Sequence, residues 1–170
     1  MINNISYLDY LTDIIIIDTG AGISDSVLDF VIASPEVLLV VTPDPSSLTD
    51  SYSLVKALYN NPKFDQNQTR LKVVANRVRS SQDGQNTYSK LSTVVENFLA
   101  GNLEYLGMIP YDSAIDNAIR QQKPISLINE NAISSKAFDV LANNLVNGAN
   151  EQYIMRRGFK DMFYNLFNRA

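Results

Sequence analysis

Residues 14–24 decide the predicted fold, and they read Ile-Ile-Ile-Ile-Asp-Thr-Gly-Ala-Gly-Ile-Ser. The isoleucine run predicts a strand covered on both faces of a parallel sheet, because such strands are continuously apolar. Asp18 follows this strand, and Gly20 and Gly22 come directly after it. A carboxylate is the hard oxygen ligand that Mg²⁺ prefers, and glycines let backbone N–H groups approach an anion. The motif therefore indicates a nucleotide site, with a simple βα turn as the alternative.

The composition limits the chemistry that is open to the chain. Its 170 residues suit one domain with a sizeable core. It contains neither cysteine nor histidine, which excludes disulfides, thiolate metal sites and Ser-His-Asp catalysis. A net charge of −4 argues against a general nucleic-acid surface. No apolar run is long enough to span a bilayer and no secretion signal is evident, so we expect a cytoplasmic protein.

Strand-length apolar runs alternate with amphipathic stretches of helix length. This alternation predicts an α/β fold, a doubly wound and mostly parallel sheet with helices on both faces. The predicted strands are residues 14–17, 37–42, 71–75 and 105–109. The predicted helices are residues 24–33, 46–59, 88–99, 113–122 and 134–145. The polar segment 80–87 is predicted to be an exposed loop. Ligands of such sheets bind beyond the carboxyl ends of the strands.

Two further motifs follow predicted strands. Asn76 and Arg77 come after residues 71–75, and an asparagine amide has the donor and acceptor needed to read an adenine edge. Arg77 is suited to stacking on the base or holding the loop, whereas a turn asparagine is the alternative reading of Asn76. Pro110 and Asp112 end the next strand, where they could line a base pocket. Asp112 could equally cap the helix that follows.

These motifs together resemble a known family. The matching segments, in order, are IIIIDTGAGIS, VVTPDPSSLTDSYSLVKAL, VVANRVRS and LEYLGMIPYD. They are similar to the MinD/ParA group of deviant-Walker ATPases over residues 5–148, and most similar to its FlhG (FleN/YlxH) branch, which regulates flagellar number and placement. The resemblance implies a P-loop NTPase fold of the SIMIBI/MinD type, ATP and Mg²⁺ as cofactors, and a homodimer in the ATP state.

The resemblance also implies roles for individual residues. Asp18 would be the catalytic Walker B aspartate and would order Mg²⁺ through a water. Residues 19–22 would form the switch II loop, with the Gly22 N–H near the γ-phosphate. Asn76 would contact the adenine edge. The residues that would bind the nucleotide are Thr19, Gly20, Gly22, Asn76, Arg77, Pro110 and Asp112.

The lysine-rich phosphate loop of the family has no counterpart in the chain. That loop reads Lys-Gly-Gly-x-Gly-Lys-[Ser/Thr] and precedes Walker B, yet the only lysine in the first sixty residues is Lys56. Losing four or more charge-assisted hydrogen bonds removes roughly 6 kcal/mol, or over four decades of affinity. We therefore expect the C-terminal part of such an ATPase, truncated at the N-terminus and unable alone to bind or hydrolyse ATP tightly. Residues 14–17 would have an unpaired apolar edge.

The last twenty residues differ from the rest, so we expect a partial nucleotide-binding domain at 1–150 and an amphipathic basic helix at 151–170. The apolar residues at helical spacing are Met155, Phe159, Met162, Phe163, Leu166 and Phe167. The basic residues among them are Arg156, Arg157 and Lys160. This pattern is typical of an interfacial membrane helix, and docking on the domain is the alternative. The resemblance favours membrane targeting.

The predicted function is therefore part of a flagellar regulator that couples ATP-dependent dimerisation to reversible binding of an anionic membrane. The resemblance implies the SRP-type GTPase FlhF and flagellar switch or regulatory proteins as partners, and a peripheral location at the inner membrane. No direct nucleic-acid partner is expected. The alternatives are a non-catalytic interaction module of the same fold, a MinD-type division-site protein and a ParA-type partitioning protein.

Overall fold

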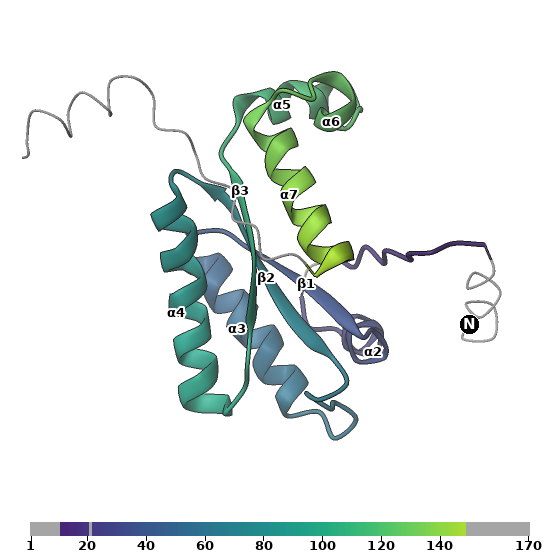
Figure 1. Cartoon of the computed structure of the whole chain (residues 1–170). Helices are drawn as coiled ribbons and strands as arrows, with labels where there is room; N and C mark the ends of the chain where they lie inside the picture. Colours follow the sequence, from purple (N-terminus) through teal and green to yellow (C-terminus); the bar gives the residue numbers. More distant parts are fainter. Residues whose placement is uncertain (1–10, 21, 149–170) are drawn as a thin grey trace, which may run out of the picture.

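A computed structural model describes residues 11–20 and 22–148, and its centre is a parallel sheet of three strands (Figure 1). The strands are β1 (Glu36–Val41), β2 (Arg70–Val78) and β3 (Glu104–Pro110), in the spatial order β1-β2-β3. Val40 of β1 lies opposite Val74 of β2 in the parallel register. These strands confirm the sequence predictions at 37–42, 71–75 and 105–109, with small differences at their ends.

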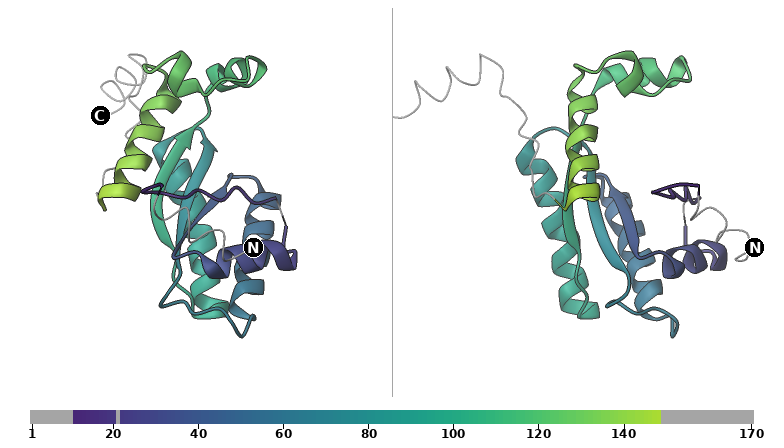
Figure 2. Two further views of the ribbon diagram at one scale, coloured as in Figure 1. Left: turned by 90° about the vertical axis from the view of Figure 1, so that its right-hand side faces the viewer. Right: turned by 45° about the vertical axis from the view of Figure 1, so that its right-hand side comes forward.

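Helices cover both faces of the sheet, as the sequence predicts (Figures 1 and 2). The helices are α2 (Asp25–Ala33), α3 (Pro45–Tyr59), α4 (Ser81–Leu99), α5 (Ser113–Arg120), α6 (Ile125–Ile128) and α7 (Ile133–Asn147). α3 and α4 connect successive strands and lie on one face, whereas α7 packs on the other face over β3. A parallel sheet needs such crossovers, because short hairpins cannot join parallel strands. No helix within the described ranges is long and apolar enough to cross a membrane.

The two faces of the sheet contribute to different core clusters, because side chains of a strand alternate between faces. Val73 of β2 is fully buried in the larger cluster, where Val55 of α3 and Val95 of α4 also pack. Its neighbour Val74 points the other way and packs with Leu141 of α7. A strand that buries adjacent residues on opposite faces is mostly apolar, as in the Val-Val-Ala run of β2 at residues 73–75, although Lys72 next to it is also buried.

α7 lies unusually close to β3. Gly107 of β3 has φ +149°, and a Cβ built there would lie 2.8 Å from Cδ2 of Leu141. The buried Asn144 donates a hydrogen bond from Nδ2 to the Leu106 carbonyl at 3.0 Å. A residue without a side chain at position 107 therefore lets the helix approach the backbone of the strand.

Charged side chains tie the amino ends of the three strands together. Arg70 of β2 forms two hydrogen bonds with Glu104 of β3, at 2.8 and 2.7 Å, and one with Glu36 of β1 at 3.2 Å. Lys72, whose side chain is only 6% exposed, contacts the same Glu36 at 2.8 Å. The hydrogen bond from Arg70 lowers the pKa of Glu104, outweighing the desolvation that opposes it.

The predicted strand at residues 14–17 is wrong. These residues form no strand, and all four isoleucines are exposed, Ile16 by 83%. They run as an extended segment that stands away from the sheet (Figure 2). A strand exists only where a neighbour accepts its backbone hydrogen bonds. Within the described residues β1 pairs with β2 alone, and residues 14–17 pair with neither.

The predicted loop at residues 80–87 is also wrong, because α4 begins at Ser81. The Ser80 Oγ accepts a hydrogen bond from the Asp83 N–H at 3.1 Å, and the Asp83 carboxylate accepts one from the Arg79 N–H at 3.0 Å. This is the arrangement of a capped helix start. The polar residues of this segment therefore belong to the first two turns of α4 and not to a loop.

Candidate nucleotide site

A polar pocket lies where the three strands end. It has a volume of about 620 Å³ and is lined by Pro43, Asp44, Arg77, Arg79, Asp83 and Tyr111. The first two follow β1. Arg77 is near the end of β2 and Arg79 follows it, Asp83 is in the first turn of α4, and Tyr111 follows β3. The carboxyl edge of a parallel sheet is where such folds bind ligands. Two arginines and two aspartates give the lining a balanced charge.

Asn76 and Arg77 lie at a strained bulge near the end of β2. The Asn76 Oδ1 accepts a hydrogen bond from the Arg77 N–H at 2.9 Å. Arg77 has φ +57°, in the left-handed region, and the register of β2 against β3 shifts between Asn76 and Val78. Left-handed backbone costs a non-glycine residue about 1 kcal/mol or more, and such strain gathers at functional sites. Asn76 thus contributes a hydrogen bond to the bulge at which Arg77 joins the pocket lining.

Tyr111 faces Arg77 from the neighbouring strand. The guanidinium carbon of Arg77 lies 6.0 Å from the centroid of the Tyr111 ring, within reach of a cation–π interaction. The Tyr111 N–H donates to the Val78 carbonyl at 2.9 Å, which fixes its backbone next to β2. Sequence reasoning missed Tyr111 as a site residue. The available signal was an aromatic residue between two residues that were already candidates, Pro110 and Asp112.

Pro110 and Asp112 have structural roles in the described chain. Pro110 is fully buried at the end of β3. The Asp112 Oδ1 accepts from the Ala114 N–H at 2.9 Å, which caps α5, and its Oδ2 accepts from the Ser134 Oγ at 2.7 Å. Burial opposes ionisation of Asp112, but these hydrogen bonds outweigh it and lower the pKa of the carboxyl. The capping role left open by the sequence is therefore present, and a contact with a base stays a prediction.

The described residues of the motif, 18–20 and 22, do not line the pocket. Asp18, Thr19 and Gly20 are exposed. Gly22 has φ +113°, which only glycine adopts readily. No group of three or more acidic side chains that could hold a metal occurs in the described ranges. Binding of a nucleobase by the pocket residues and of Mg²⁺ by Asp18 both stay predictions. The candidate membrane residues at 156–167 lie outside the described residues.

Several proteins of known role are similar in sequence to the chain. Antiactivator FleN of Pseudomonas aeruginosa is 41% identical over 133 residues, covering 78% of the chain and 46% of FleN. The flagellum site-determining protein YlxH of Helicobacter pylori is 37% identical over 167 residues, covering 95% of the chain and 53% of YlxH. A chloroplastic MinD homologue of Arabidopsis thaliana is 30% identical, covering 89% of the chain and 46% of that protein. No family profile matches the chain.

Solved structures share the fold. The MinD cell division protein of Aquifex aeolicus superposes with a TM-score of 0.64 at 20% identity, covering 91% of the chain and 61% of that protein. The cell division ATPase MinD of Pyrococcus furiosus gives a TM-score of 0.64 at 24% identity, covering 85% and 56%. The fold and the pocket at its carboxyl edge define a parallel α/β protein of the MinD type. The chain belongs to the MinD/FlhG-type ATPase family. It spans about half the length of the curated relatives that it matches.

Proposed function

We propose that the chain supplies the base-binding part of a MinD/FlhG-type ATPase that controls flagellar number and placement. Its polar pocket at the carboxyl edge of β2 and β3, in a chain 41% identical to FleN, carries this proposal. Asn76 stabilises the bulge of β2 that contains Arg77, and Arg77 and Tyr111 would receive the base. ATP bound with Mg²⁺ supplies the phosphoryl group that the family hydrolyses. In the complete protein, ATP-dependent dimerisation would be coupled to reversible membrane binding, with FlhF and flagellar regulatory proteins as partners.

The first test compares ATP with adenosine by calorimetry on the whole chain. The proposed site consists of the polar pocket for the base, and the given sequence contains no phosphate-binding lysine loop. We expect both ligands to bind in the millimolar range, equivalent to about −4 kcal/mol, and within about tenfold of each other. Micromolar binding of ATP together with weak binding of adenosine would contradict this proposal, because it would mean that the chain binds the phosphates as well as the base. If neither ATP nor adenosine binds, the proposed nucleotide function is wrong.

The second test concerns residues 151–170, which we propose to bind an anionic membrane. The measurement is co-sedimentation of the whole chain with vesicles of mixed neutral and anionic lipid. The variant Phe163→Asp with Phe167→Asp should lose pelleting, because it places two charges on the predicted apolar face. Phe98→Asp is the matched control, since Phe98 is an exposed aromatic on α4 (74%). Equal pelleting of the tail variant and the unmodified chain would contradict the membrane role.

The basic residues of the tail give the same proposal a second readout. Each cation near an anionic surface contributes about 1 kcal/mol. Replacing Arg156 and Lys160 by glutamine should therefore weaken binding to anionic vesicles roughly thirtyfold. Binding to purely neutral vesicles should change little.

A non-catalytic interaction module of the same fold is the second candidate function. The observations that favour it are that Asp18, Thr19 and Gly20 are exposed and that the given sequence contains no phosphate-binding lysine loop. This candidate predicts no binding of adenosine or ATP, so the calorimetric comparison distinguishes it from the first.

A further inference from the structure

The chain contains one asparagine that is directly followed by glycine. The pair is Asn147 and Gly148, at the end of α7. In such a pair the backbone nitrogen of the glycine can attack the side-chain carbonyl carbon of the asparagine, because no Cβ on the second residue crowds the ring that forms. The reaction needs an exposed pair, an attacking nitrogen without a hydrogen bond, and a backbone that can open locally.

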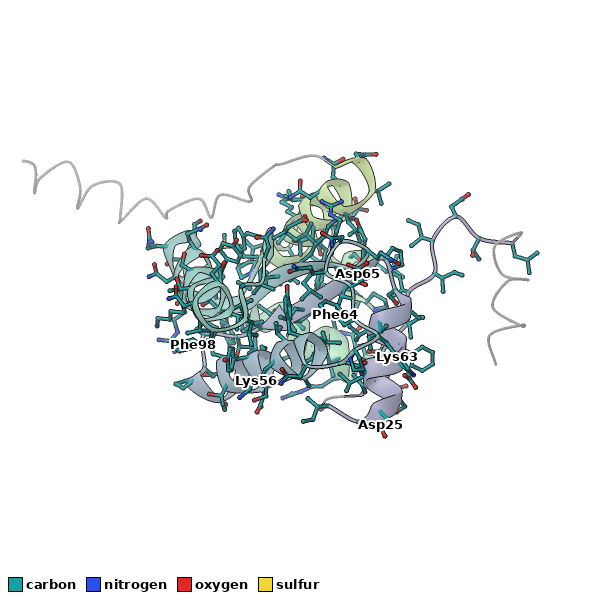
Figure 3. The ribbon with its side chains drawn as sticks, turned by 90° about the horizontal axis from the view of Figure 1, so that it is seen from below. Asp25, Lys56, Lys63, Phe64, Asp65 and Phe98 are labelled. Carbon is teal, nitrogen blue, oxygen red and sulfur yellow. The ribbon has the colours of Figure 1, made fainter. Side chains whose placement is uncertain are left out.

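Both residues are accessible. Asn147 and Gly148 are exposed, and a Cβ built on Gly148 meets nothing within 4 Å. The end of α7, in yellow-green, lies at the surface of the molecule when it is seen from below (Figure 3). The Asn147 Nδ2 donates to the Asn143 Oδ1 at 2.6 Å. That bond is exposed, so water can replace it when the amide turns toward Gly148.

The attacking nitrogen is not held by the helix. Gly148 is the C-cap of α7, with φ +63°, and its N–H donates to no described residue. The other glycine that follows an acidic or amide side chain is Gly84, after Asp83. Gly84 is buried inside α4, and its N–H donates to the Ser80 carbonyl at 3.1 Å. Helix ends open far more readily than helix interiors, so ring closure is accessible at residues 147–148 and not at 83–84.

We propose that Asn147 is a site of spontaneous deamidation, which converts the neutral end of α7 into an anionic one. A bond forms between the Gly148 nitrogen and the Asn147 Cγ, and the bond between Cγ and Nδ2 breaks. Ammonia leaves with the proton of the Gly148 nitrogen. Water then opens the cyclic imide at either carbonyl, giving aspartate or isoaspartate. Water is the only other reactant, and nothing is oxidised or reduced.

The new carboxylate would lie at an unfavourable position. The C-terminus of a helix carries partial negative charge, which repels an anion. Asn147 also lines a pocket of about 570 Å³ at the amino ends of the strands, together with Glu36 and Glu104. Arg70 and Lys72 line the same pocket, but they are already paired with these two acids. We therefore expect the modification to loosen the last turn of α7.

The first test incubates the full-length chain at mildly alkaline pH and maps its peptides by mass spectrometry at intervals. We expect Asn147 to be converted at least about tenfold faster than the buried Asn144, since an opening cost of about 1.4 kcal/mol already slows a reaction by that factor. The same incubation in urea is the reference. If Asn147 reacts in urea but stays unchanged in the folded chain, α7 protects it and the proposal is wrong.

The charge of the incubated chain gives a second readout, by isoelectric focusing. The unmodified chain should accumulate a more acidic form. Asn147→Gln should not accumulate it, because the longer side chain disfavours ring closure. Asn117→Gln is the matched control, since Asn117 is an exposed helical asparagine on α5, and it should behave as the unmodified chain does. Equal accumulation of the acidic form in Asn147→Gln would overturn the assignment of the site.

The effect on α7 is tested with a variant that reproduces one product. Asn147→Asp should have a melting temperature about 1–3 °C below that of Asn147→Gln, because it adds an anion at the helix C-terminus. Equal melting temperatures would overturn the expected loosening of α7. The peptide maps decide the modification itself, so the two parts of the proposal can fail separately.

Discussion

Asp112 joins two helices with one carboxylate. Its Oδ1 caps α5 through Ala114, and its Oδ2 accepts from Ser134 in the first turn of α7. Asp112→Asn should lower the free energy of unfolding by about 1–3 kcal/mol at pH 7, because it removes charge-assisted hydrogen bonds from a partly buried site. Urea unfolding measures the change. Asp116→Asn, which neutralises an exposed carboxylate on the same helix, is the control and should differ little.

The effect of Asp112 should depend on pH. Folding lowers the pKa of this carboxyl, so its stabilisation is complete above the pKa of about 3.9 in the unfolded chain and is lost as the pH falls through the folded value. The difference between the unmodified chain and Asp112→Asn should therefore shrink below about pH 4. A difference that stays constant down to pH 2 would contradict this account.

At this scale, sequence reasoning reached the right positions but not their conformations. Asn76, Arg77 and Asp112 were singled out because they follow predicted strands, and the structure places them at the carboxyl edge of the sheet. Nothing in the sequence indicated the left-handed φ of Arg77, because glycine and asparagine are the residues that usually adopt it. Tyr111 contributes through a contact between two strands, which local spacing does not encode.

At the scale of elements, the contact between α7 and β3 depends on the missing side chain of Gly107. Gly107→Ala should destabilise the fold by about 1–3 kcal/mol, since it combines strained backbone with a Cβ that would lie 2.8 Å from Leu141. Chemical denaturation measures the loss. Gly20→Ala is the control, because a Cβ there meets nothing within 4 Å.

A double variant separates the two causes. Leu141→Ala removes the clashing methyl group, so the pair should lose less stability than the sum of the single variants. Strict additivity would show that backbone strain at position 107, and not the contact with α7, accounts for the loss.

Helices and strands with a clear apolar pattern were predicted well from the sequence. The start of α4, which has a polar composition, was not. β2 follows from its nearly continuous apolar run, and α3 follows from its apolar spacing. The start of α4 was missed although Ser80 and Asp83 carry the spacing of a capping motif. The polar composition of residues 80–87 suggested a loop, but in the structure these side chains cover the exposed side of the first turns.

At the scale of the whole molecule, residues 14–17 test whether an apolar run needs a partner. Ile16→Ser should change the free energy of unfolding by less than about 0.5 kcal/mol, because the side chain is 83% exposed. Val73→Ala is the comparison, since Val73 is fully buried, and it should cost about 2–3 kcal/mol. A loss of several kcal/mol in Ile16→Ser would show that the run is buried in solution.

The error at residues 14–17 has a physical origin. Composition and β-branching give a segment its tendency to form a strand, but hydrogen bonds to a neighbour decide whether it does. Whether a neighbouring strand is present depends on the whole sheet and not on the sequence of residues 14–17. β1, β2 and β3 pair with one another in the described sheet, whereas residues 14–17 pair with none of them. The prediction from apolar runs was therefore correct for the three strands and wrong for residues 14–17.

Arg70 and its two glutamates also determine how the sheet assembles. Parallel strands are joined by long crossovers, so no tight turn dictates which residue meets which, and a slip by one position would turn Val73 away from the core. In the native alignment Arg70 stands opposite Glu36 and reaches Glu104. A slipped strand would place its guanidinium on the opposite side from both acids. Exposed ion pairs add little to final stability, but losing this one would add to the cost of a strand misaligned by one residue.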